Sequence, residues 1–91
     1  MVQRNKAIVR GIVQGIGFRP FVYNLAKKHK LTGYILNNST GVEIDVEGES
    51  VHIDKFFVEL ENDHPPLARI TSVNRSSAPI KNYADFKIRK A

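Results

Sequence analysis

The chain has 91 residues, 42% of them hydrophobic, and a formal net charge of +5 at pH 7. This length suits one hydrophobic core, so we expect a single domain over residues 1–91. The absence of cysteine excludes thiolate catalysis, disulfides and thiolate metal sites and favours a cytoplasmic setting, and no apolar run approaches the roughly 18 residues that span a membrane.

The first half of the chain predicts a strand, a helix and two further strands. Residues 6–13 alternate as a strand does, and residues 20–30 place apolar side chains at helical spacing behind a proline suited to the first turn. Residues 32–37 predict a second strand that ends in the turn formers 37–41. Apolar and acidic residues then alternate strictly, which predicts a third strand with one buried face and one wet face, the wet face carrying Glu43, Asp45 and Glu47.

The second half predicts one more helix and two strands. Ser50 is expected to cap a helix with apolar residues at i, i+3, i+4 and i+7, which ends before His64-Pro65-Pro66. Residues 67–76 predict a strand with an irregularity, because Ile70 and Val73 are three positions apart. Residues 83–89 predict a short last strand. The order β-α-β-β-α-β with a terminal addition predicts the α+β class: a ferredoxin-like sandwich of an antiparallel sheet with two helices on one face.

A glycine-spaced segment with an arginine lies between the first strand and the first helix. Loop amides and a helix N-terminus present N–H donors to an anion, and a guanidinium matches the geometry of phosphate. Residues 1–41 carry seven basic and no acidic residues, which also favours an anionic ligand. The sequence therefore predicts a phosphate-binding site made of Gln14, Gly15, Ile16, Gly17, Phe18 and Arg19.

The predicted topology brings Asn37 to the same edge of the sheet. The first and second strands run parallel with the third between them, so their C-terminal ends lie about 10 Å apart. Arg19 and Asn37 then converge on a ligand of phosphate size. This inventory has no nucleophile and no carboxylate pair. It can stabilise negative charge and position a water, which suffices only for a good leaving group such as that of a carboxyl-phosphate anhydride.

The segment GIVQGIGFR, with Asn37 eighteen residues after Arg19 inside GYILNNSTGV, resembles the acylphosphatase family over essentially the whole chain. The resemblance implies that backbone amides of residues 16–19 and the Arg19 guanidinium hold the phosphate of a small acyl phosphate. It also implies that Asn37 orients the attacking water, so Arg19 and Asn37 are the expected catalytic residues. We expect no metal ion and no cofactor.

The flanking residues are similar to a particular branch of this family. Pro20-Phe21-Val22-Tyr23 and Pro65-Pro66-Leu67-Ala68-Arg69-Ile70 resemble the N-terminal acylphosphatase-like domain of hydrogenase-maturation carbamoyltransferases. This resemblance implies carbamoyl phosphate as the substrate and the downstream domains of a larger maturation protein as partners. A free-standing acylphosphatase is the alternative.

This fold class also includes proteins with two functions other than hydrolysis. Nucleic-acid modules of this fold class expose aromatic and basic residues on their central strands, whereas this chain places acidic residues there, so we expect no nucleic-acid partner. A non-catalytic phosphate-binding or docking domain would carry the same motif, and it stays open. The three histidines lack metal-ligand spacing and are expected at the surface.

Overall fold

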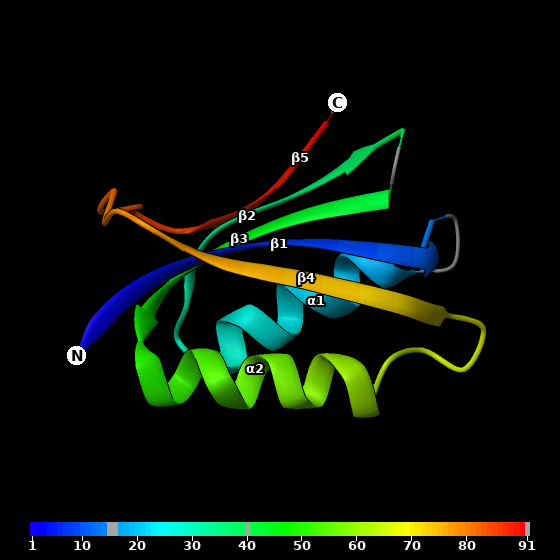
Figure 1. Ribbon diagram of the computed structural model, residues 1–91, viewed down its shortest axis with the longest axis horizontal. Coiled ribbons are helices and arrows are strands. Elements are labelled where there is room, and N and C mark those ends of the chain that lie inside the picture. The colour runs from blue at the N-terminus through cyan, green and yellow to red at the C-terminus, as the bar shows by residue number, and fades with distance from the viewer. Residues whose placement is uncertain (15–16, 40, 91) are drawn as a thin grey trace.

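Two helices cover one face of a five-stranded sheet (Figure 1). The computed structural model describes residues 1–14, 17–39 and 41–90. The sheet order is β4-β1-β3-β2-β5, and this architecture confirms the predicted α+β, ferredoxin-like fold. The elements in chain order are β1 (Val2–Ile12), α1 (Phe18–Lys28), β2 (Thr32–Asn38), β3 (Gly41–Glu49), α2 (Ser50–Asn62), β4 (Arg69–Ala78) and β5 (Phe86–Arg89).

The central strand of the sheet is β3. It is antiparallel to β1 on one side, where Ile44 pairs with Ala7, and antiparallel to β2 on the other, where Ile44 pairs with Ile35. Since both neighbours run against β3, β1 and β2 run parallel to each other, as the topology predicts. Their C-terminal ends therefore share one edge of the sheet.

The fifth strand makes the sheet mixed, whereas the sequence predicts an antiparallel sheet. Ile88 of β5 pairs with Ile35 of β2 in a parallel ladder. The reason lies in the two outer strands of the sheet. β4 is antiparallel to β1, and the chain then crosses to the other side of the sheet and reverses its direction. A strand that reverses relative to β4 has the same direction as β1 and β2, so β5 is parallel to β2.

The hydrophobic core fills the space between the sheet and the helices. The apolar residues of β3 and the i, i+3, i+7 residues of α2 are fully buried, which confirms both periodicities. Phe56 and Phe57 pack edge to face at 5.1 Å between ring centroids. Each fully buried large side chain contributes about 1.5–3 kcal/mol. Residues at 0% exposure include Val9, Val22, Ile35, Val42, Ile44, Val46, Ile53, Phe56 and Leu60.

Both helices begin at positions that differ from the expected ones. α1 begins at Phe18, two residues before Pro20, because Gly17 has a left-handed backbone (φ 81°) and turns the Phe18 side chain into the core. α2 begins at Ser50 itself. Glu49 is the extended residue before the helix and no side chain caps it, so the predicted Ser50 cap is wrong.

The predicted irregularity in the fourth strand is a bulge beside a glycine. Arg10 pairs with Ser72 and Gly11 pairs with Ile70, which leaves Thr71 as the extra residue of β4. Gly11 has φ 134°, and a Cβ on it would lie 1.9 Å from the carbonyl oxygen of Arg69. Only glycine allows the two strands to approach this closely.

The face of the sheet opposite the helices carries buried charges, which contradicts the predicted wet face. Asp45 is 0% exposed, Glu47 is 5% exposed and Glu43 is half-buried. Arg4 of β1 donates to Asp45 from Nε and from Nη2, with Nη2 2.7 Å from Oδ2. The hydrogen bond to Asp45 is the main reason that the pKa of Arg4 is raised. Arg4 and Asp45 therefore form a buried ion pair.

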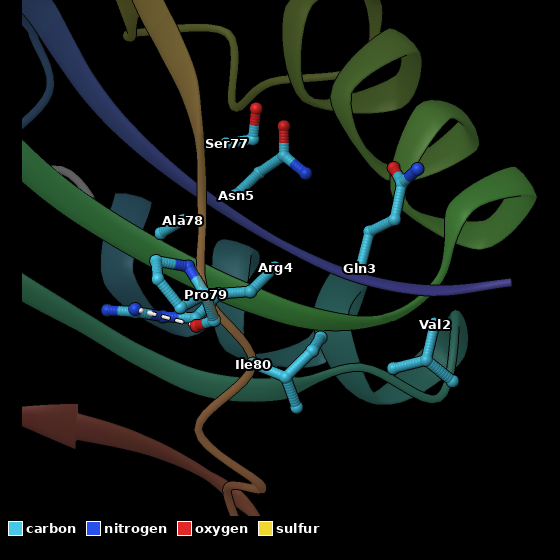
Figure 2. A pocket seen from close by; sticks show the side chains of 8 residues that line it. All are labelled: Val2, Gln3, Arg4, Asn5, Ser77, Ala78, Pro79 and Ile80. Atoms are coloured by element: carbon cyan, nitrogen blue, oxygen red, sulfur yellow. Dashed lines mark hydrogen bonds between the residues drawn. The ribbon is translucent and has the colours of Figure 1, made fainter.

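Residues 79–85, the crossing segment, cover these charges on the way from β4 to β5. The carbonyl of Pro79 accepts a hydrogen bond from Arg4 Nη1 at 3.1 Å (Figure 2). The Tyr83 hydroxyl donates to Asp45 Oδ2 at 3.0 Å. Alternation along β3 cannot reveal this cover, because the residues that provide it lie more than thirty positions away in the chain.

Glu47 holds the crossing segment through main-chain donors. The backbone N–H groups of Lys81 and Tyr83 donate to its carboxylate at 2.6 and 2.9 Å. Burial acts to raise the pKa of Glu47, but these N–H groups and that of Asn82 outweigh burial and lower the pKa. The ionised carboxylate therefore stabilises the folded chain.

His29 contradicts the expectation of surface histidines. It follows α1, its side chain is 10% exposed, and its Nε2 lies 3.2 Å from Oε1 of Glu59 in α2. The contact joins the ends of the two helices.

Neither helix among the described residues has the length and apolar character to cross a membrane.

We expect the lowered pKa of Glu47 to appear as an acid dependence of stability. Unfolded, Glu47 ionises near its ordinary pKa of 4.5. Its contribution is therefore present above that pH and is lost as pH falls through the lower pKa of the folded state. Glu47→Gln should lack this part of the dependence. Denaturant unfolding at several values between about pH 7 and pH 2 measures it, and an unchanged acid dependence in Glu47→Gln would contradict it.

Removing Arg4 should destabilise the domain strongly. Arg4→Met leaves Asp45 buried without its ionic partner, which costs about 3–5 kcal/mol of unfolding free energy. Arg10→Met is the matched control, since Arg10 is exposed on the same strand and faces the same side, and it should change stability by about 0.5 kcal/mol or less. Urea unfolding checks both, and equal losses would refute the buried pair as the cause.

Candidate functional site

The ends of β1 and β2 meet at one edge because β3 pairs with both. Val42 of β3 faces Val9 of β1 on one side and Asn37 of β2 on the other. Asn37 therefore lies two strand spacings, about 10 Å, from β1. The C-terminal ends of β1 and β2 lie on the right-hand side of Figure 1. In the chain, Gln14 follows β1 and Gly17 precedes α1.

Asn37 presents a buried acceptor that has no partner. It lies on the same face of β2 as Ile35, which is fully buried in the core, so its side chain lies on the helix-covered face. Its Oδ1 is buried and accepts no hydrogen bond from the described residues. Leaving such an atom unpaired costs about 1–3 kcal/mol. A hydrogen bond from a water or a ligand would satisfy this atom.

The start of α1 presents main-chain N–H donors of the kind that bind anions. Gly17 precedes the helix, and its carbonyl accepts the first helical hydrogen bond, from the N–H of Phe21 at 3.2 Å. The N–H groups of Phe18 and Arg19 have no acceptor within the helix and stand at the positive end of its dipole. The first turn contains no acidic residue, so no side chain of that turn competes with a bound anion.

Arg19 contributes an unengaged guanidinium. Its side chain is half-buried, and it makes no hydrogen bond or ion pair with any residue in the described parts of the chain. A guanidinium offers five N–H donors in a planar fork that suits phosphate oxygens. The position predicted to bind phosphate thus has its donors free.

Gln14 uses its side chain for another purpose. Its Nε2 donates to the carbonyl oxygens of Asn38 and Gly41, each at 3.1 Å. Gly41 has φ 147°, and a Cβ on it would lie 2.3 Å from the Val9 carbonyl oxygen, so glycine is required there. Of the described donors of Gln14, the backbone N–H is the one left for a phosphate.

The predicted site residues lie together in part within the described structure. Gln14, Gly17, Phe18 and Arg19 lie at the edge that also holds Asn37, whereas Gly15 and Ile16 fall outside the described residues. Sequence reasoning missed the two carbonyl groups that receive Gln14. The sequence signal for these carbonyl groups was the glycine that directly follows a run of turn formers. At Gly41 the turn between β2 and β3 approaches β1 closely.

The sheet edge with Arg19 and Asn37 offers hydrogen-bond donors and one amide acceptor, Asn37 Oδ1. Across residues 1–14, 17–39 and 41–90, no three His, Asp or Glu side chains gather as metal ligands. A pocket of about 290 Å³ lies at the opposite end of β1, between Val2, Arg4 and Ile80 (Figure 2), away from the predicted site. The edge with Arg19 and Asn37 can hold a tetrahedral anion and orient a water.

Comparison with known proteins gives one consistent family. The acylphosphatase family model matches residues 5–88. The chain is 46% identical over 84 residues to a probable carbamoyltransferase HypF of Methanocaldococcus jannaschii, covering 91% of this chain and 11% of that protein. It is 39% identical over 82 residues to an acylphosphatase of Photorhabdus laumondii, covering 89% of each.

The fold comparison agrees with these sequence matches. The crystal structure of full-length HypF in a phosphate- and nucleotide-bound form superposes with a TM-score of 0.96 at 42% identity. The alignment covers 99% of this chain and 12% of that one. This chain thus spans about a tenth of the length of the carbamoyltransferases that it matches.

We expect inorganic phosphate to stabilise the folded chain by mass action. At about ten times its Kd, phosphate adds roughly 1.4 kcal/mol, which raises the Tm of a domain this size by about 5–10 °C. Arg19→Ala should lose most of this rise, whereas Arg69→Ala, an exposed arginine at the start of β4, should keep it. Thermal melts in phosphate and in chloride of equal ionic strength measure the effect. A rise that is the same in Arg19→Ala and wild type would place the phosphate elsewhere.

Proposed function

The chain belongs to the acylphosphatase family, and from this we propose that it hydrolyses carboxyl-phosphate anhydrides, either acyl phosphate or carbamoyl phosphate. The products are the carboxylate or carbamate and inorganic phosphate. The observation that carries the proposal is the presence at one sheet edge of two groups that have no partner among the described residues: the Arg19 guanidinium and the buried Asn37 Oδ1. The first suits an anion and the second suits a water.

The proposed reaction divides the work between two strand ends. The main-chain N–H groups at the start of α1 and the Arg19 guanidinium bind the phosphoryl oxygens and stabilise their charge in the transition state. Oδ1 of Asn37 accepts a hydrogen bond from the water that attacks phosphorus. Binding both reactants in one geometry supplies much of the rate.

No basic side chain is required, because of the leaving group. As the water oxygen bonds to phosphorus, the bond from phosphorus to the carboxyl oxygen breaks and its electron pair leaves on a carboxylate or carbamate. The water proton passes to an oxygen of the phosphoryl group itself, so the products are the anion and dihydrogen or monohydrogen phosphate. A carboxylate leaves without protonation, which agrees with a site that contains donors and an amide.

We further propose that the chain is the acylphosphatase-like domain of a carbamoyltransferase, acting on carbamoyl phosphate beside the downstream domains of a larger maturation protein. The higher identity to the HypF protein, 46% against 39% for the free acylphosphatase, supports this branch. The resemblance of the segment from Pro65 to Ile70 to this branch supports it as well. In the structure this segment forms a turn in which the Ala68 N–H donates to the Pro65 carbonyl at 2.9 Å and Leu67 is 75% exposed.

Two substitutions should separate the roles of Arg19 and Asn37. Asn37→Ala should lower kcat by about 100-fold or more while the inhibition constant of inorganic phosphate stays within about 3-fold, because Asn37 acts on the water. Arg19→Ala should lower kcat/KM by a similar factor and also weaken phosphate inhibition. Asn24→Ala, at an exposed position of α1, is the control and should match wild type.

The measurement is the initial rate with acetyl phosphate and with carbamoyl phosphate, with phosphate as inhibitor. A preference for carbamoyl phosphate in kcat/KM supports the carbamoyltransferase branch, and a preference for acetyl phosphate supports a free-standing acylphosphatase. Phosphate binding with hydrolysis of neither substrate would refute the enzyme and leave a phosphate-binding docking domain.

A further inference from the structure

The side chain of Gln14 connects the two halves of the candidate site. One half is the segment that leads from β1 into α1 and provides Gly17 and Arg19. The other is the facing ends of β2 and β3, directly after Asn37. The Gln14 bridge consists of two hydrogen bonds from Nε2, to Asn38 O and to Gly41 O, both 3.1 Å long.

The β-ladders do not make this connection. Among residues 1–14, 17–39 and 41–90, the pairing between β1 and β3 extends as far as Val9 with Val42. On its other side β1 pairs with β4 through Ile12 with Arg69. The Gln14 bridge is a hydrogen-bonded link from the segment after β1 to the ends of β2 and β3.

The Gln14 bridge should affect phosphate binding and the attack by water differently in the proposed reaction. In the proposed reaction the phosphate contacts groups on the α1 side alone, so its binding should not require the bridge. Attack by water requires the phosphate on one side and Asn37 on the other at a fixed separation, and displacements of about 1 Å at such a site cost up to about 100-fold in rate. The bridge should therefore act on kcat and leave phosphate affinity unchanged.

We propose that Gln14 is a positioning residue that sets the distance between the bound phosphate and Asn37 by joining the two strand ends with its side-chain amide. The inference rests on the proposed hydrolysis. It differs from the sequence-based expectation, in which Gln14 binds phosphate, because the side chain donates to main-chain carbonyl groups. Its backbone N–H remains compatible with that expectation.

Three variants test the bridge. Gln14→Met keeps the length of the side chain and removes the donors. Gln14→Lys keeps a donor group that reaches the same two carbonyl oxygens. Gln3→Met is the matched control, because Gln3 is the other glutamine of the chain and is exposed at the opposite end of β1. All are compared with wild type well below their melting temperatures, so that a loss of stability alone does not change the rate.

We expect Gln14→Met to lower kcat about 10- to 100-fold with the inhibition constant of phosphate within about 2-fold of wild type. Gln14→Lys should recover a large part of kcat, and Gln3→Met should equal wild type. The backbone amide resonances of Asn38 and Gly41 should shift in Gln14→Met and stay in place in Gln3→Met. An unchanged kcat in Gln14→Met would overturn the inference, and so would a Gln14→Lys variant as slow as Gln14→Met.

The results separate this inference from the proposed function. A wild-type chain that hydrolyses neither acetyl nor carbamoyl phosphate refutes the proposed hydrolysis and, with it, the role of Gln14 in the rate. The existence of the bridge is then still decided by the amide resonances. Phosphate affinity that falls in Gln14→Met as much as in Arg19→Ala would show a phosphate ligand and overturn the positioning role while leaving the hydrolysis proposal intact.

Discussion

The main-chain ladders that β3 forms with β1 and β2 position every part of the candidate site. Val42 lies between Val9 and Asn37, so one residue of β3 sets where Asn37 stands relative to the segment that leads to Arg19. A slip of β2 by one residue against β3 would turn Asn37 to the opposite face of the sheet. The buried residue Ile35 of β2 opposes this slip, since the same shift would move Ile35 out of the core.

Local sequence patterns correctly predicted features that depend on a single helix or strand. The wrong predictions concern features that depend on contacts between distant parts of the chain. Alternation along β3 identified its core face correctly, and the helix of residues 50–62 followed from its apolar spacing. The pattern could not show that Asp45 and Glu47 are buried, because Arg4 and Tyr83 approach them from distant parts of the chain. The left-handed Gly17 that starts α1 early is a backbone property with no periodic signal.

In the candidate site, too, features of single segments were predicted and contacts between distant segments were not. Its residue types predicted an anion site at the end of the first strand, and the parallel course of β1 and β2 predicted that Asn37 shares that edge. The sequence analysis did not predict where the Gln14 side chain binds, because a glutamine after a strand has many carbonyl groups within reach and Gly41 indicates only where the turn lies. In the proposed site most of the donors belong to the main chain, so they depend little on side-chain identity, and relatives with 39–46% identity share the family.

The crossing segment also determines how the last strand behaves. β5 has four residues and one neighbour, β2, so an isolated ladder of this length would open and close freely. Here it follows residues 79–85, which satisfy the carboxylates of Asp45 and Glu47 and a donor of Arg4. Pulling back the chain from its C-terminus past Tyr83 would leave these buried charges short of partners. β5 and the crossing segment therefore release together as one cooperative unit, and amide hydrogen exchange in them follows a common, infrequent opening in place of end fraying.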